Sequence, residues 1–235
     1  MKNGVKIRLV AVLVVFAIVF CGFQLMRTSV QTQEKQARAF VHQLAKNAFP
    51  SAARQTRDLY GLIPLRSDPK SGEQSGSVVL IHGLDEPGKI WMNLGPALVE
   101  KGFRVFDMLY PNDQAISLSS EFFFEELMNL ADQGEISVIA HSMGGLVTRD
   151  MLTRTDLNYD LLAGRGRLPR IRRLIMVGTP NHGSQLARFR IITEIRDQVY
   201  HWLNKDSHAL HFLLDGTGAA AVDLIPGSDF LESLN

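Results

Sequence analysis

The 235-residue chain has little of what several protein classes require. Its single cysteine, Cys21, excludes a disulfide within the chain. Twenty-five Lys and Arg against 24 Asp and Glu give a formal net charge of +1, without a long basic run. This balance gives no electrostatic reason to expect nucleic acid as a partner. No set of Cys, His and acidic residues has the spacing of a metal site, and His201, His208 and His211 are better explained as one face of a helix.

The N-terminal region contains the longest uncharged apolar run, Leu9–Met26. As a helix it would be about 27 Å long, close to the thickness of a hydrocarbon core. Lys2, Lys6 and Arg8 precede it, and no small-x-small cleavage pattern follows. We therefore expect residues 1–27 to form an uncleaved signal anchor in a membrane, with the rest of the chain outside the cytoplasm, in the periplasm or at the cell surface. Cleavage and secretion are the alternative.

The remaining chain divides into a juxtamembrane helix and linker, residues 28–76, and a domain, residues 77–235. Within the domain, short apolar strands alternate with amphipathic helices. This alternation predicts an α/β fold with a parallel sheet and helices on both faces. Ligands of such folds bind at the carboxyl ends of the strands. The expected strands are 78–82, 103–109, 136–140 and 174–177, and the expected helices are 90–101, 117–133 and 144–153.

Ser142 lies in "VIAHSMGGLV", where it follows an expected strand and precedes an expected helix. Ala140 and Gly144 leave room for a sharp strand-to-helix turn, which projects the serine hydroxyl above the sheet. The first N–H groups of a helix are unpaired, so the Met143 N–H is a predicted oxyanion donor. These features predict that Ser142 is a nucleophile. The alternative is an ordinary turn in which the serine caps a helix.

The loop "IHGLDEPG" follows the first expected strand of the domain. Gly83 lets the backbone turn toward the pocket, and the Leu84 N–H is the second predicted oxyanion donor. The His82 side chain is expected to support the loop through a hydrogen bond. Supporting roles around the nucleophile are thus predicted for His82, Gly83, His141, Gly144 and Gly145.

The segments "HSMGG", "GTPNHGS" and "DLIPGSDFLESLN" resemble the α/β-hydrolase superfamily, and within it the bacterial triacylglycerol lipases and the GPI inositol-deacylase-like esterases. The resemblance covers approximately Ser77–Asn235. It implies ester hydrolysis through an acyl-enzyme, an acyl-lipid-like substrate, and neither cofactor nor metal. Two alternatives are a non-catalytic binding module with the same fold and an acyltransferase in which another nucleophile replaces water.

The acid and base that would activate the serine are harder to place. Their order in this superfamily is serine, acid, histidine. No convincing strand follows Val177, and Thr217–Asn235 is expected to be loop and turn. We therefore expect the domain to be C-terminally incomplete, without its last strands and its triad acid and base. Within the chain the candidates are Asp113 and His182, with Asp107, Asp215 and Asp223 as alternative acids. Leu186–Leu214 is expected to be either a lid or a set of packing helices.

Overall fold

The computed structural model describes residues 59–65, 76–84, 86, 89–187 and 218–235. The expected anchor, most of the linker and of the expected lid segment, the three histidines 201, 208 and 211, and Asp215 lie outside these residues. Within the described ranges, no helix is long and apolar enough to cross a membrane.

The described strands form one five-stranded mixed sheet with the order β1-β3-β2-β4-β5. The strands are β1 (Gly61–Leu65), β2 (Ser77–Ile81), β3 (Arg104–Leu109), β4 (Glu135–His141) and β5 (Arg170–Val177). β1 pairs antiparallel with β3, whereas all other pairs are parallel. The expectation of an entirely parallel sheet is therefore wrong for its β1 edge. β1 does not alternate between apolar and polar residues, and it contains Pro64. The proline is tolerated because the strand lies at an edge of the sheet.

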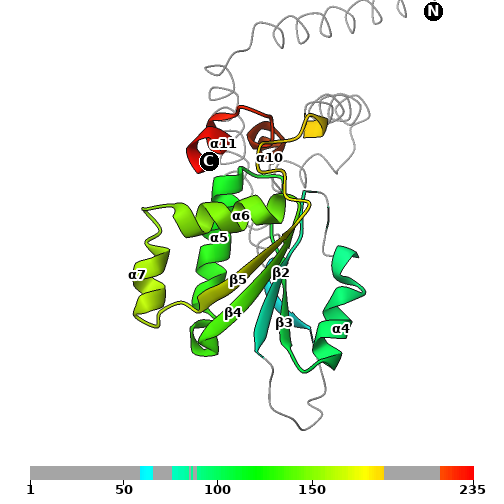
Figure 1. The fold of residues 1–235 in the computed structure, drawn as a ribbon, viewed down its shortest axis with the longest axis vertical. Coiled ribbons are helices and arrows are strands. Elements are labelled where there is room, and N and C mark those ends of the chain that lie inside the picture. Colours follow the sequence, from blue (N-terminus) through cyan, green and yellow to red (C-terminus); the bar gives the residue numbers. More distant parts are fainter. Residues whose placement is uncertain (1–58, 66–75, 85, 87–88, 188–217) are drawn as a thin grey trace, which may run out of the picture.

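Helices cover both faces of the sheet, as the sequence predicts (Figure 1). The short helix η1 (Lys89–Trp91) and α4 (Leu94–Glu100) lie on one face, and α5 (Ile116–Met128), α6 (Met143–Thr153) and α7 (Tyr159–Gly164) lie on the other. Each of two expected helices is divided in two. The expected helix 90–101 consists of η1 and α4, and the expected helix 117–133 consists of α5 and the short helix η2 (Ala131–Gln133). Helix α7 was not expected from the sequence.

The core follows from the alternation of side chains along the strands. On β4, Ile136, Val138 and Ala140 are buried against the α5 and α6 side. On the α4 side a smaller cluster contains Val78, Leu80, Trp91 and Val105. Burial of such side chains stabilises the fold by about 1.5–3 kcal/mol each.

Two short helices follow the last described strand, although this segment was expected to be loop and turn. They are α10 (Ala219–Asp223) and α11 (Asp229–Leu234), and they lie beyond one end of the sheet (Figure 1). The buried Asp223 carboxylate accepts a hydrogen bond of 2.8 Å from the Ile116 N–H in the first turn of α5. In the described residues 178–187 and 218–235 no strand follows β5.

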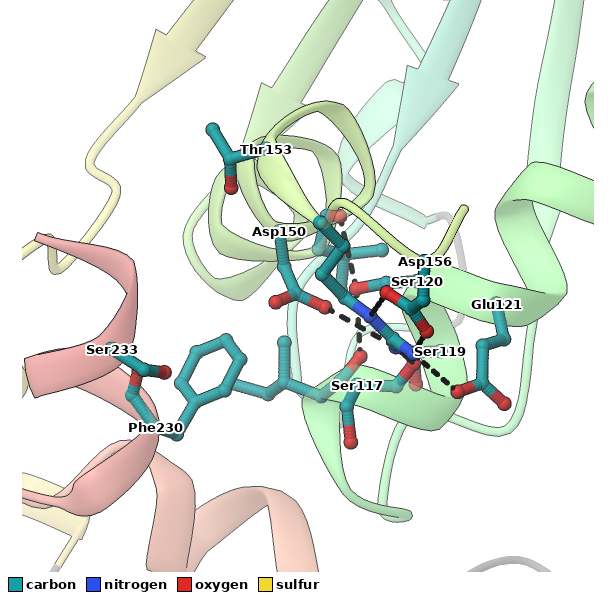
Figure 2. Close-up of polar contacts among 12 residues, drawn as sticks. Ser117, Ser119, Ser120, Glu121, Asp150, Thr153, Asp156, Phe230 and Ser233 are labelled. Atoms are coloured by element: carbon teal, nitrogen blue, oxygen red, sulfur yellow. Dashed lines mark hydrogen bonds and ion pairs between the residues drawn. The ribbon is translucent and has the colours of Figure 1, made fainter. Parts of the chain in front are cut away.

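A polar network joins the end of α6 to α5. The guanidinium of Arg154 donates to the Ser117 carbonyl at 3.0 Å and to the Glu121 carboxylate at 2.9 Å. It also pairs with Asp156 and lies 3.8 Å from the buried Asp150 carboxylate. Figure 2 shows these partners converging at the helix contact, close to Phe230 of α11. The network fixes how α5 and α6 pack.

Candidate functional site

Ser142 occupies a tight turn between β4 and α6, as the sequence predicts. Its backbone has φ 51° and ψ −124°, and it is one of two described non-glycine residues with positive φ. Such a conformation is strained for a residue with a side chain, and strained residues cluster at functional sites. The Ser142 N–H donates to the Val177 carbonyl at 2.9 Å, which ties the turn to β5. Among the described residues, nothing hydrogen-bonds to its hydroxyl group.

The glycines after Ser142 are explained by close backbone packing. A Cβ at Gly144 would lie 2.6 Å from the Ile81 carbonyl oxygen and 2.7 Å from that of His82. A Cβ at Gly145 would collide with the side chain of Thr179, in the loop after β5. The start of α6 thus packs directly against the ends of β2 and β5.

The loop after β2 lies against the serine itself. A Cβ at Gly83 would be 2.9 Å from the Ser142 Cβ and 3.3 Å from its hydroxyl oxygen. The loop "IHGL" and the turn at Ser142 therefore meet at the carboxyl ends of two neighbouring parallel strands. This is the edge at which α/β folds bind ligands.

Two backbone donors flank this contact. Leu84 follows Gly83, and Met143 is the first residue of α6. In the part of the chain that the structure describes, neither N–H has a hydrogen-bond acceptor. The two predicted oxyanion donors therefore have no partner in the described part of the chain, and their role in binding an oxyanion stays a prediction.

His82 is almost fully buried, and its ring is held on two sides. Its Nδ1 lies 2.8 Å from the Gly83 carbonyl oxygen. Because a carbonyl oxygen only accepts hydrogen bonds, Nδ1 carries the proton. The ring also stacks on Tyr110 with centroids 4.6 Å apart. Burial lowers the pKa of His82, and hydrogen bonding to Gly83 only partly opposes this, so the environment favours the neutral imidazole. His82 thus hydrogen-bonds to its own loop, and its role in supporting the site stays a prediction.

His141, which was also given a supporting role, is half-buried beside Ser142. Its Nδ1 atom is shielded from solvent and has no hydrogen-bond partner among the described residues. The supporting role of His141 stays a prediction.

The candidate acid and base are not brought together by a described contact. The Asp113 carboxylate accepts a hydrogen bond of 2.8 Å from the Gly218 N–H, which precedes α10. His182 is exposed on the loop after β5. No hydrogen bond or ion pair in the described ranges joins His182 to Asp113 or to Ser142. The alternative acid Asp223 instead caps α5. The catalytic roles of Asp113 and His182 stay predictions.

Asp107 belongs to a separate cavity of about 420 Å³ on the α4 side of the sheet. The cavity is lined mainly by apolar side chains, including Leu65, Trp91 and Val99, and Ser142 does not line it. Burial raises the pKa of Asp107 to about 6. Its Oδ1 atom has no hydrogen-bond partner among the described residues. No group of three or more potential metal ligands occurs in the described part of the chain.

Comparison with sequence families gives one match. The family described as a domain of unknown function (DUF7379) matches residues 118–235, which is half of the chain. The chain belongs to this family. The matched region contains the turn at Ser142, the loop after β5 and both C-terminal helices, whereas the loop at Gly83 lies before it. No curated protein matches the chain at a significant level.

Solved structures similar to this member of the family include hydrolases. The propeptide form of the Bacillus licheniformis lipase BlEst2 aligns with a TM-score of 0.50 and 16% identity, over 73% of this chain and 34% of that chain. The mature form of the same lipase aligns with a TM-score of 0.49 and 18% identity, over 73% of this chain and 62% of that chain. The phospholipase PlaB from Legionella pneumophila aligns with a TM-score of 0.41 and 20% identity, over 68% of this chain and 33% of that chain. The chain thus spans less than two thirds of each. The likeness to the propeptide form supports an α/β-hydrolase-like fold and does not single out the inositol-deacylase-like group.

Proposed function

We propose that this protein is a serine hydrolase that cleaves carboxylic esters through an acyl-enzyme on Ser142. The observation that carries the proposal is the strained turn at Ser142, whose hydroxyl and two neighbouring backbone N–H groups have no hydrogen-bond partner among the described residues. A serine that only capped α6 would accept a hydrogen bond from the helix, but the Ser142 side chain forms no such cap.

The proposed reaction uses this arrangement. The Ser142 Oγ attacks the ester carbonyl carbon and loses its proton to a base, for which His182 is the candidate within this chain. The oxyanion accepts hydrogen bonds from the N–H groups of Leu84 and Met143. Each such donor is worth about 10²–10³-fold in kcat. The alcohol leaves with the proton, and water then hydrolyses the acyl-enzyme to release the acid and restore the hydroxyl.

Acyl-lipid-like esters are the proposed substrates. Leu84 packs partly against a cluster formed by Ala221 and Val222 of α10 and Ile225 just after it, so the surroundings of one predicted oxyanion donor are apolar. An apolar environment favours an acyl chain over a charged substituent. The expected N-terminal anchor would place such an enzyme at a membrane surface, and this location outside the cytoplasm belongs to the proposal.

The test is covalent labelling of the full-length protein with an alkyl fluorophosphonate, followed by peptide mass spectrometry. We expect the label on Ser142, and we expect hydrolysis of p-nitrophenyl butyrate that disappears in Ser142→Ala. Ser233→Ala, which removes a hydroxyl from α11, serves as the matched control and should retain both. Labelling that persists in Ser142→Ala contradicts the proposal.

The two alternatives give different results in the same assay. A non-catalytic module would be neither labelled at Ser142 nor active on any ester. An acyltransferase would be labelled at Ser142, would hydrolyse the ester slowly, and would release p-nitrophenol faster when an acceptor alcohol was added.

A further inference from the structure

Tyr110 directly follows β3 and reaches the loop that packs against Ser142. Its side chain is 2% exposed. Its hydroxyl donates to the His82 carbonyl oxygen at 2.8 Å. Its ring stacks on the His82 imidazole with an interplanar angle of 28°. One tyrosine therefore holds both the backbone and the side chain of His82.

The His82 side chain passes this constraint to the next peptide. Its Nδ1–H donates to the Gly83 carbonyl oxygen at 2.8 Å. The C=O and N–H of a trans peptide point in opposite directions, and the chain contains no cis peptide bond among its described residues. Fixing the Gly83 carbonyl therefore also fixes the direction of the Leu84 N–H, which belongs to the same peptide plane.

We propose that Tyr110 is a positioning residue, which orients the Gly83–Leu84 peptide through His82 so that the Leu84 N–H faces the oxyanion formed at Ser142. The inference rests on the proposed function. It adds that the hydrogen bond from Tyr110 contributes to the rate of the reaction as well as to folding. Gly83 lies in contact with Ser142, so a small rotation of this peptide changes the geometry at the reacting atoms.

The main experiment compares Tyr110→Phe with Tyr159→Phe in the full-length protein. Tyr159 is the matched control, because it is also buried and its hydroxyl also bonds to backbone, donating to Pro169 at 3.0 Å, but it lies at α7. Both variants should lower the melting temperature. Only Tyr110→Phe should lower kcat for p-nitrophenyl butyrate and slow fluorophosphonate labelling, each by about tenfold, with KM changed by less than twofold.

Substitutions of His82 test the same contact without changing Tyr110. An asparagine can place an amide N–H near the position of Nδ1, whereas a glutamine places it near Nε2. His82→Asn should therefore retain at least tenfold more kcat than His82→Gln. Equal kcat in these two variants, or a Tyr110→Phe variant that lowers stability but keeps kcat within twofold of wild type, overturns the positioning role alone. A wild-type protein that is not labelled at Ser142 overturns the proposed function and this inference with it.

Discussion

A Cβ atom at Gly83 would lie 2.9 Å from the Cβ of Ser142, closer than side chains in folded proteins approach one another. The backbone of Gly83 does not have the positive φ that requires glycine, so space alone excludes a larger residue. The loop after β2 and the turn at Ser142 are therefore in direct contact, and a change in one displaces the other.

From this contact we predict that Gly83→Ala lowers kcat for p-nitrophenyl butyrate by about 100-fold, because the added methyl group displaces the loop from Ser142. The stability cost should be about 1–3 kcal/mol. Gly164→Ala is the matched control, since a Cβ at the end of α7 meets no atom within 4 Å. It should leave kcat unchanged and raise stability slightly. Equal kcat for both variants would contradict the close contact.

The C-terminal helices supply a second prediction. The Asp223 side chain is 2% exposed and accepts from the Ile116 N–H at 2.8 Å, where α5 has no side-chain cap of its own. Asp223→Ala should lower the free energy of unfolding by about 1–3 kcal/mol, because it leaves a buried N–H without its partner. Glu232→Ala, at an exposed position of α11, should change it by less than about 0.5 kcal/mol. Urea unfolding measures both, and similar midpoints would argue against the contact.

The sequence predicted most of the parallel sheet and the turn at Ser142, because both depend on local patterns. Buried strands are continuous apolar runs, and the small residues around Ser142 report close packing that Gly144 and Gly145 now explain. The edge strands were harder to find. Only the apolar second half of β5, residues 174–177, was expected, because its exposed first half carries Arg170, Arg172 and Arg173 and shows no apolar run.

Contacts between distant segments could not be predicted from local patterns. The hydrogen bond from the Gly218 N–H to the Asp113 carboxylate joins residues more than a hundred positions apart, so no local pattern indicates it. The stacking of Tyr110 on His82 also depends on the pairing of β2 with β3. The only sequence signal for it is a tyrosine immediately after an apolar strand, which a core position would explain equally well.

The network at Arg154 gives a third prediction. Arg154→Met keeps much of the side-chain volume. It removes the N–H that donates to the Ser117 carbonyl oxygen, and it removes the positive charge near the buried Asp150 carboxylate. We expect a loss of about 1–3 kcal/mol in the free energy of unfolding. Arg172→Met removes an exposed ion pair with Glu135 and should cost less than about 0.5 kcal/mol. Urea unfolding at low salt measures both variants, because guanidinium salts would screen the ion pairs. Equal losses of unfolding free energy in the two variants would argue against a contribution of the Arg154 network.

The last prediction concerns Asp107 and the dependence of stability on pH. Burial raises the pKa of this carboxyl from its ordinary 3.8 to about 6. Well below pH 3.8 the carboxyl is protonated in both the folded and the unfolded states, so it imposes no penalty. Between pH 4 and 6 the unfolded chain ionises while the folded protein keeps the proton, so the free energy of unfolding falls as the pH rises. Above pH 7 the full penalty applies, at most about 3 kcal/mol and, because the group is partly solvated, closer to about 1–2 kcal/mol.

Asp107→Asn removes this titration, so we expect the variant to be more stable than wild type by about 1–2 kcal/mol at pH 8 and within about 0.5 kcal/mol of it at pH 4. Urea unfolding at intervals between these pH values should show the difference growing mainly from pH 4 to 6. Asp160→Asn, at an exposed position of α7, should differ from wild type by less than about 0.5 kcal/mol throughout. A gain for Asp107→Asn that was the same at pH 4 and pH 8 would mean that removing the buried charge is not its cause. A loss of stability at pH 8 would mean that the ionised carboxylate has a stabilising partner in the folded protein.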